Sequence, residues 1–439
     1  MNQINFKKLI CLTVFFIVLD FCSLSYSGQW YGFQKDAQHT GDSRANFSGD
    51  LKPLWEYKPA EHVWRYKKGY SVWSSSVSIA DVKGRPMIFA GYYNNNLYAI
   101  DAESGSLIWR FIAGDAFNSS PCFGIVNNKP MVYAVSSDRI IYALDAETGK
   151  RIWSYETEPW NYTASEAITS SPLIVSMGGK SILICCVWNS NHSVLGGFQK
   201  GEIFALDAAD GSVIYRKKLS STPLNSPAFA YIKDKPVLFV SSFDGNIFAL
   251  DAKDAGEIWK ITACAEVRSS PSIYEKKGNA LLFFGSRFGN LYCLDAASGK
   301  IIWTRKVGHA IDSTPAITNI GSRTFVYIGA YDRNIYAFDA ESGDEMWKFT
   351  TGDYVVSSCV VASISGKKVI FEHSLDNKIY CLDALTGKLI WSKELGKLIW
   401  KYNTRGDTIW SSPAIADIKD DSVLVFPCYD GAIYAFSSK

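Results

Sequence analysis

Seven aspartates recur along the chain at a nearly constant spacing, and carboxylates in series are natural candidates for acid–base chemistry or metal binding. The intervals between them are 44, 62, 44, 44, 44 and 44 residues. A catalytic site needs a few unlike groups that converge, whereas equivalent copies in equivalent surroundings indicate a structural role. We therefore interpret all seven as turn residues. They are Asp101, Asp145, Asp207, Asp251, Asp295, Asp339 and Asp383.

The sequence around each aspartate predicts a β-hairpin. In residues 94–109, NNNLYAIDAESGSLIW, apolar residues alternate up to the Asp, and the strand pattern resumes after Glu-Ser-Gly. Asp at the first turn position can accept hydrogen bonds from the backbone amides beyond it, and Gly tolerates the left-handed conformation that closes the turn. The fourth copy has Ala255 at the Gly position and Gly256 one residue later. This departure predicts a strained or differently shaped turn.

A second recurrent motif, Ser-Ser-Pro or a close variant, begins each repeat. From its second residue to the hairpin Asp is 25 residues in every complete copy except the third, where it is 36. Another apolar run lies between the two, so each repeat holds four strands. Eight such repeats predict an all-β fold, an eight-bladed β-propeller of four-stranded antiparallel blades. Small Ser side chains suit the crowded axis, and the Trp that ends most repeats can pack between blades. The motifs begin at Ser75, Ser119, Ser170, Asn225, Ser269, Ser313, Ser357 and Ser411.

The last repeat is incomplete, because the sequence stops at Lys439 just after its third strand. Residues 51–57, LKPLWEY, resemble the fourth strand of the other repeats. We predict that they complete the last blade and close the ring, which would protect its strand edges. The domain boundaries are then 1–27 for a signal peptide, 28–50 for an extended lead-in over the surface, and 51–439 for a single propeller.

The first 27 residues have the features of a secretory signal. Lys7 and Lys8 precede an apolar run, and Ser25 and Ser27 are small residues where a signal peptidase would read them. An uncleaved membrane anchor is the alternative, although the run is short for a span. Cys22 lacks the small preceding residues of a lipoprotein signal. We expect a periplasmic or secreted monomer without a membrane span in the mature chain.

Charge and cysteine content exclude further classes. The chain has 45 Lys and Arg against 43 Asp and Glu, and no basic run that would follow phosphates, so no nucleic-acid partner is expected. Eight cysteines outside the signal lie mostly in apolar strand-like runs, which indicates packed thiols. Cys185 and Cys186 should point to opposite faces of a strand. A disulfide between these two neighbours is the alternative.

The repeated hairpin LYALDAxTGxxxW with its Ser-Ser-Pro start resembles the pyrroloquinoline quinone (PQQ) repeat of bacterial quinoprotein-like propellers. The resemblance covers roughly residues 29 to 439. The family includes quinone-dependent dehydrogenases and non-enzymatic scaffolds such as the BamB lipoprotein of outer-membrane assembly, so it specifies the fold more than the activity. The lead-in is also similar to the start of many secreted members, at Trp30, Phe33, Asp36, His39, Thr40 and Gly41.

For a dehydrogenase, the resemblance implies a quinone at the axis, a calcium held by carboxylate and amide side chains, an Asp base and a Trp floor. The residues just before the eight motifs include one carboxylate, Asp312, whereas calcium takes six or more oxygens. We expect Asp312 to pair with Arg268, and Trp410 to be packed rather than a stacking floor. His309 could form an acid–base pair with Asp312, but we favour a surface loop histidine. The eight residues are Ser74, Asn118, Thr169, Leu224, Arg268, Asp312, Val356 and Trp410.

We therefore expect no catalytic residue, no metal site and no cofactor, and interpret the protein as an exported, non-enzymatic binding or scaffold propeller. The alternative is a PQQ-dependent oxidoreductase with calcium.

Four connections are longer than in the other repeats, and we place them on one face, over blades seven, eight, one, two and three. Aromatic and Arg residues on long loops are typical of binding sites for a protein, a peptide or a glycan. The alternative is that the insertions pack on each other. The predicted binding face comprises Trp64, Arg65, Tyr66, Lys67, Tyr70, Trp160, Tyr162, Trp188, Lys401, Tyr402, Arg405 and Trp410.

Overall fold

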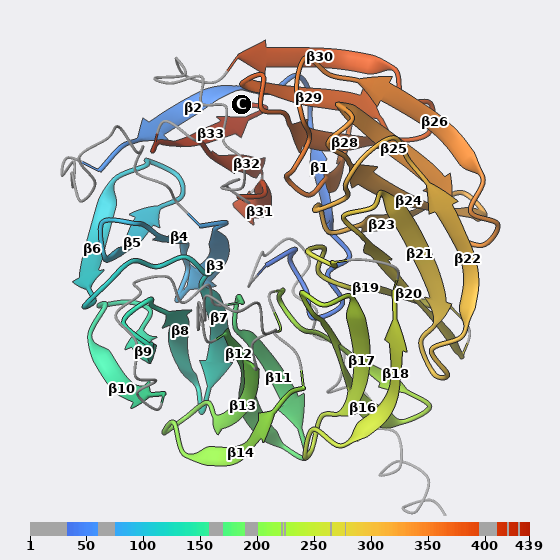
Figure 1. Cartoon of the computed structure of the whole chain (residues 1–439). Coiled ribbons are helices and arrows are strands. Elements are labelled where there is room, and N and C mark those ends of the chain that lie inside the picture. Colours follow the sequence, from blue (N-terminus) through green and yellow to red (C-terminus); the bar gives the residue numbers. More distant parts are fainter. Residues whose placement is uncertain are drawn as a thin grey trace, which may run out of the picture.

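The structure is a computed structural model, and it describes most of the chain (Figure 1). The statements below refer to the described residues alone. These are residues 33–59, 75–157, 170–188, 201–220, 223, 225–263, 266–276, 278–394, 411–418, 421–428 and 431–439.

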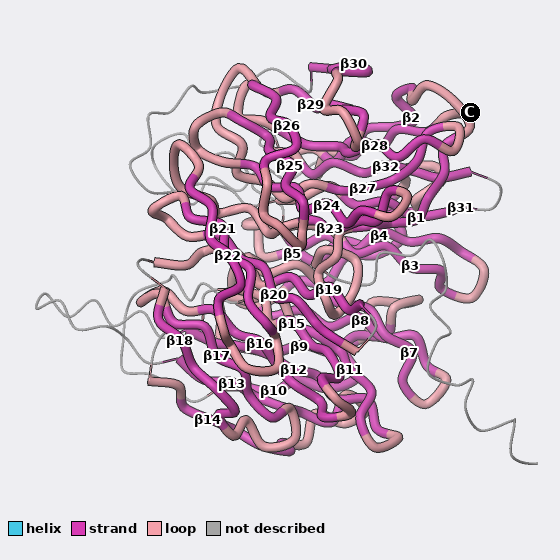
Figure 2. Tube along the Cα trace, turned by 90° about the vertical axis from the view of Figure 1, so that its right-hand side faces the viewer, coloured by secondary structure: helices cyan, strands magenta, loops and turns pink. Residues whose placement is uncertain are grey.

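Eight β-sheets stand in a ring around a central axis, and strands and loops alone make up the described chain (Figures 1 and 2). Seven blades are each built from four consecutive antiparallel strands, the first at the axis and the fourth at the rim, and the eighth takes its fourth strand from the N-terminal segment. Blades 1 and 2 are β3 (Ser78–Val82), β4 (Arg85–Gly91), β5 (Asn96–Asp101), β6 (Leu107–Ile112), and β7 (Cys122–Val126), β8 (Lys129–Val135), β9 (Ile140–Asp145), β10 (Arg151–Glu156). Blades 3 and 4 are β11 (Leu173–Met177), β12 (Lys180–Trp188), β13 (Gly201–Asp207), β14 (Val213–Lys218), and β15 (Ala228–Ile232), β16 (Lys235–Ser241), β17 (Asn246–Asp251), β18 (Glu257–Thr262).

The remaining blades repeat this plan, and the predicted eight-bladed propeller is confirmed. Blades 5 and 6 are β19 (Ser272–Lys276), β20 (Asn279–Gly285), β21 (Asn290–Asp295), β22 (Ile301–Lys306), and β23 (Ala316–Ile320), β24 (Arg323–Gly329), β25 (Asn334–Asp339), β26 (Glu345–Thr350). Blade 7 is β27 (Val360–Ile364), β28 (Lys367–His373), β29 (Lys378–Asp383) and β30 (Leu389–Glu394). Blade 8 is β31 (Ala414–Ile418), β32 (Asp421–Pro427), β33 (Ile433–Ser437) and β2 (Lys52–Tyr57).

The closure of the ring by the N-terminal strand is confirmed. β2 pairs antiparallel with β33, with Lys52 opposite Ser437 and Tyr57 opposite Ile433. The Trp55 indole packs on the hairpin between β5 and β6 of blade 1 and donates a hydrogen bond to the carbonyl oxygen of Ala102 at 3.0 Å. The strand therefore joins blade 8 to blade 1 as the other closing strands join their neighbours.

The hairpin aspartates hold the turns, as predicted. The Asp101 carboxylate accepts a hydrogen bond from the backbone N–H of Ser104 at 2.9 Å, and Gly105, at φ +71°, donates to the Asp101 carbonyl at 2.8 Å. In the fourth copy Ala255 donates the same bond to Asp251 at 2.8 Å with φ +56°. Of the two predicted alternatives, a strained or a differently shaped turn, the structure supports the first: the turn keeps the shape of the others, and Ala255 occupies the left-handed region that favours Gly.

The lead-in does not lie over the surface, so that expectation is wrong. β1 (Asp42–Phe47) lies inside the ring (Figure 1). It pairs in parallel with β27, and its residues Ser43, Ala45 and Phe47 are buried. An inner strand otherwise leaves backbone donors unpaired at the axis, which is costly when they are buried. We call residues 36–47 the strap.

The strap crosses the inner strands of four successive blades and bonds to the equivalent residue of each. Backbone N–H groups spaced by 44 residues donate to carbonyls of the strap, at distances of 2.7 to 2.9 Å. The strap therefore binds equivalent positions of four successive repeats. The bonds run from Phe229 to Ala37, from Ile273 to Gln38, from Ile317 to Thr40, and from Val361 to Gly41.

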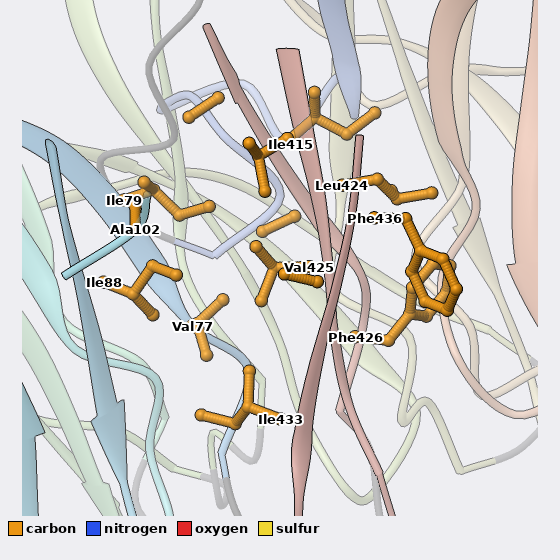
Figure 3. Close-up of a cluster of buried hydrophobic side chains, with 14 of the residues drawn as sticks. Val77, Ile79, Ile88, Ala102, Ile415, Leu424, Val425, Phe426, Ile433 and Phe436 are labelled. Atoms are coloured by element: carbon orange, nitrogen blue, oxygen red, sulfur yellow. The ribbon is translucent and has the colours of Figure 1, made fainter. Parts of the chain in front are cut away.

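The hydrophobic core is divided among the interfaces between neighbouring blades. Figure 3 shows one such cluster, in which Val77, Ile79 and Ile88 of blade 1 face Ile415 and Val425 of blade 8. Because every interface buries apolar side chains from two sheets, each blade depends on both of its neighbours.

Candidate functional site

The Ser-Ser-Pro motif forms a hydrogen-bonded ring around the axis. In six of the described interfaces, the backbone N–H of its second residue donates to the hydroxyl of the equivalent residue in the next blade. The bond from Thr314 to Ser358 is 2.9 Å long, and that from Ser412 to Ser76 is 2.7 Å. The sequence predicted that small residues fit there, but not this bonding. The motif is structural.

The closing Trp residues are also structural, as predicted. The Trp109 indole donates to the Ala146 carbonyl at 2.9 Å and lies on Gly149, where a Cβ would be 2.6 Å from the ring. Blade 3 ends in Tyr215 instead, and the hairpin that it packs against carries Ala255 instead of Gly. The smaller ring leaves room for the added methyl group.

The seven described cysteines follow the prediction of packed thiols, and Cys264 lies outside the described residues. Cys185 and Cys186 are free and buried, in adjacent positions of the regular strand β12. Their side chains enter different core clusters, Cys185 between blades 2 and 3 and Cys186 between blades 3 and 4. The described geometry therefore excludes the disulfide between these neighbours.

Four charged residues lie where the inner strands of blades 5 and 6 begin. We call Glu266, Arg268, Arg287 and Asp312 the mouth cluster, and the side of the ring where inner strands begin the motif face. Arg287 Nη1 lies 3.2 Å from Asp312 Oδ2, and Arg268 pairs with Glu266. The predicted pair of Arg268 and Asp312 is therefore wrong. Glu266 is only two residues from Arg268, and the loop after β20 brings Arg287 to Asp312.

Burial dominates the behaviour of Asp312. Its side chain has no exposed area, and this desolvation raises its pKa, while the positive charge of Arg287 acts in the opposite direction. The Arg287 guanidinium also lies over the Tyr331 ring, 5.4 Å from the centroid. His309 stacks on Tyr331 at 6.0 Å and accepts a hydrogen bond at Nδ1 from the Ala310 N–H. The cluster is a packed network of charges and rings.

The mouth cluster does not fit a calcium ion. Among the described residues before the motifs, Asn118, Arg268, Asp312 and Val356, only Asp312 is a carboxylate. The guanidinium 3.2 Å from its oxygen already supplies the positive charge that a metal would bring. Within the described ranges, no group of three or more His, Cys, Asp or Glu side chains could hold a metal ion.

One loop residue on the motif face departs from a structural pattern. In blades 2, 6 and 7 an Asp in the loop between the second and third strands accepts a hydrogen bond from a backbone N–H of the preceding connection. Asp138 receives it from Gly114 at 2.8 Å, and Asp332 receives it from Gly308 at 3.0 Å. In blade 5 this position is Phe288, which is 60% exposed and follows Arg287. The sequence analysis missed Phe288, although aligning SRFG with AYDR and SSDR would have revealed it.

A second departure is buried in blade 7. Glu372 occupies a strand position that is apolar in the other blades, as at Ala90 and Ala134. Its carboxylate accepts hydrogen bonds from the Ser357 hydroxyl, from the Cys359 thiol at 2.7 Å and from the His373 N–H at 2.9 Å. Burial raises the pKa of Glu372 to about 7. The sequence analysis missed this group as well.

The predicted binding face is only marginally described. Trp188 is the last residue of β12, and the extra residues of the third repeat follow it before β13, as predicted. The connections before β3, β11 and β31 are the other long ones. The remaining candidates lie outside the described residues. They are Trp64, Arg65, Tyr66, Lys67, Tyr70, Trp160, Tyr162, Lys401, Tyr402, Arg405 and Trp410.

Comparison with known families identifies the repeat. The pattern of the family described as outer membrane protein assembly factor BamB matches residues 54–227, 199–280 and 278–437. The chain belongs to this family. No curated protein matches the sequence. The predicted resemblance to PQQ-type repeat propellers is confirmed.

Similar solved structures include enzymes and a scaffold. A europium-containing methanol dehydrogenase is 14% identical with a TM-score of 0.72, over 94% of this chain and 98% of that chain. A quinohemoprotein alcohol dehydrogenase from Comamonas testosteroni is 14% identical with a TM-score of 0.69, over 94% and 80%. BamB from Moraxella catarrhalis is 16% identical with a TM-score of 0.57, over 88% and 99%. At these identities the likeness establishes the fold alone. No helix in the described ranges is long and apolar enough to span a membrane.

Proposed function

We propose that the protein is a non-enzymatic binding or scaffold propeller of the cell envelope, exported to the periplasm or secreted, with a protein partner. The observation that carries the proposal is the pairing of Arg287 with Asp312 at 3.2 Å. This pairing places a guanidinium beside the carboxylate that a calcium-dependent quinone site would need. The match to the BamB family supports a role in protein assembly.

We place the contact surface for the partner on the motif face, beside the mouth cluster. Phe288 replaces an Asp that stabilises other blades, and its ring is largely exposed. Tyr354, 41% exposed, packs against Tyr331 with ring centroids 5.3 Å apart. Aromatic and Arg side chains of this kind carry much of the energy in protein interfaces. An envelope partner that docks here would use these rings as anchors.

The alternative is a PQQ-dependent oxidoreductase, which the similarity to quinoprotein dehydrogenase structures favours. Calorimetric titration of the purified protein with PQQ and calcium chloride, followed by absorption spectra, separates the two. We expect no saturable heat and no bound-quinone spectrum. Stoichiometric quinone binding, or dye-linked alcohol oxidation after reconstitution, would overturn the proposal.

A matched pair of variants tests the physical argument behind the proposal. Arg287→Ala removes the charge beside Asp312, whereas Arg305→Ala removes an exposed Arg of β22 at the rim. If Arg287 excludes cations, only the first variant should gain measurable calcium binding. Calcium binding by the wild type that Arg287→Ala leaves unchanged would contradict this argument.

A further inference from the structure

The segment that leads into the strap, residues 33–40, has an unfavourable backbone conformation. Gln34, Lys35 and His39 have φ values of +51°, +76° and +57°, in the left-handed region that favours Gly. Conformations of this kind persist only where the surrounding structure imposes them, and they recur in segments that switch between two states. The contacts of this segment with the blades therefore hold it against its own backbone preference.

The Gln34 side chain adds a second unfavourable feature. It is 1% exposed, and neither its Oε1 nor its Nε2 has a hydrogen-bond partner among the described residues. The Oε1 atom lies against Gly41, where an added Cβ would be 2.7 Å from it. A buried amide without partners loses the hydrogen bonds that it would make in water. Opening of the segment would restore those bonds.

A buried imidazole forms the contact of this segment with the Ser-Ser-Pro motif of blade 5. His39 is 2% exposed, its Nδ1 lies 2.9 Å from the Pro271 carbonyl oxygen, and the Phe33 ring meets it edge-on with centroids 5.4 Å apart. Because a carbonyl oxygen only accepts, Nδ1 carries the hydrogen, and the neutral imidazole already satisfies this bond. A second proton would place a net charge in a desolvated site.

The charges around His39 compensate for such a proton only in part. Among the charged groups of the described chain, the Asp36 carboxylate acts on the imidazole and favours its charged form, but it already accepts two hydrogen bonds within the strap. Blade 5 presents the Pro271 carbonyl, and Glu275 of β19 bonds instead to Gln38 Nε2 at 3.5 Å. Burial therefore dominates and lowers the pKa of His39 to about 4.

Gly41 marks the end of the segment that can open. Beyond it, β1 is anchored by its own bonds, in which the Asp42 carboxylate accepts from Lys368 Nζ at 2.9 Å and from the Thr318 hydroxyl at 2.6 Å. Gly41 itself, at φ +65°, has the conformational freedom that a hinge requires. Residues 33–40 can therefore leave the axis while β1 stays paired with β27.

We propose that residues 33–40 form an acid-sensitive gate at the axis, which opens when His39 gains a proton while the eight-bladed ring stays closed. Opening uncovers the backbone donors of three inner strands, in blades 4, 5 and 6. The sign follows from the two protonation equilibria. The open segment binds the proton near pH 6.5 and the closed segment near pH 4, so a fall in pH between these values favours opening. The opening equilibrium constant should rise roughly twentyfold from pH 7 to pH 5.

Native-state hydrogen exchange measures this opening at single amides, once the rates are corrected for the intrinsic effect of pH. The amides of Phe229, Ile273 and Ile317 donate to residues 37–40, and each should lose roughly twentyfold in protection from pH 7 to pH 5. The Val361 amide donates to Gly41, at the hinge, and should keep its protection. These four equivalent amides thus separate opening of the gate from loss of the whole strap.

His39→Asn is the matched variant, because an Asn amide can donate to the Pro271 carbonyl without titrating. In this variant the protection of the three gate amides should not depend on pH. The Ala296 amide, which donates to the Ala280 carbonyl at 2.9 Å within blade 5, reports on unfolding of the ring, including any caused by the buried His373 of β28.

Two results would overturn the proposal. One is an equal loss of protection at the gate amides and at Ala296 in the wild type, and the other is the same pH dependence in His39→Asn. The wild-type comparison alone is decisive if the variant does not fold. The gate does not rest on the proposed function, so the quinone titration and the exchange experiment can fail separately.

Discussion

The residue type at position 255 of blade 4 depends on the aromatic side chain of Tyr215, which packs on it from blade 3. At six of the described interfaces the closing aromatic is Trp and the residue beneath it is Gly, as with Trp153 on Gly211. A Cβ at Gly211 would lie 2.7 Å from the indole, so Trp and Ala cannot share an interface without a shift. The two departures therefore compensate each other.

This compensation predicts a specific double-mutant cycle. Tyr215→Trp alone should destabilise the fold by about 1–3 kcal/mol, because the larger ring meets the Ala255 methyl group. Ala255→Gly should cancel most of that loss, and the double variant should recover near wild-type stability. Urea unfolding of the four proteins gives the coupling, which we expect to be at least about 1 kcal/mol. Additive effects would refute the steric argument.

The buried carboxyl group of Glu372 leads to a second prediction at this scale, namely that its contribution to stability decreases as pH rises. Its pKa is about 7 in the fold, above the usual 4.5, so the folded state keeps a proton that the unfolded state has lost between these values. The protonated Glu372 therefore makes its full contribution to the free energy of unfolding below pH 4.5. This contribution declines as pH rises through 7, by on the order of 3 kcal/mol in total.

The measurement must separate Glu372 from two buried histidines that act in the opposite sense. Burial lowers the pKa of His39 and His373 to about 4, so their contribution is lost as pH falls from 6.5. The stability difference between the wild type and Glu372→Gln, from urea unfolding at pH 4.5 to 7.5, isolates the carboxyl group. We expect this difference to shift against the wild type as pH rises. Parallel curves would show that Glu372 does not titrate in this range.

At the scale of the element, the strap and β2 both lie where a blade has backbone hydrogen-bonding groups that its own strands leave unpaired. Inner strands expose donors at the axis, and the strap satisfies one in each of four blades. Composition could not reveal this, because the polar residues of the strap resemble a surface loop. β2 was predictable, since it matches the pattern of a strand missing from the last repeat.

The non-covalent attachment of β2 predicts a local effect that tethered strands should not show. Trp55→Ala removes the hydrogen bond to Ala102 and the packing on Gly105, a loss of roughly 3 kcal/mol. Because no hairpin retains β2, it should detach locally, and β33 amides should exchange faster with deuterium.

Trp303→Ala is the matched control, since it removes the equivalent bond to Ala340 while a short hairpin retains β22. Mass-spectrometric exchange should therefore show less acceleration in β21 than in β33. Equal acceleration in both would indicate that tethering does not matter and would contradict the expectation.

At the scale of the molecule, the fold was predictable because one unit recurs at a 44-residue period. The turn aspartates, the closing Trp residues and the missing strand all follow from that period. The candidate site was less predictable, since it depends on departures such as Arg287, Phe288 and Glu372, each visible only when the repeats are aligned in space. The pairing of Arg287 with Asp312 joins a loop of blade 5 to the segment just before the inner strand of blade 6, and no local pattern encodes that distance.

The pairing of β2 with β33 also determines when, during synthesis, the ring can close. β2 is among the first strands to be synthesised, and its partner β33 is the last. During synthesis, β2 must remain without its partner until β33 has been made, because almost four hundred residues separate the two strands along the sequence. The ring thus cannot be completed on an unfinished chain. A truncated translation product would leave one blade open and expose an edge that quality-control proteases and chaperones can recognise.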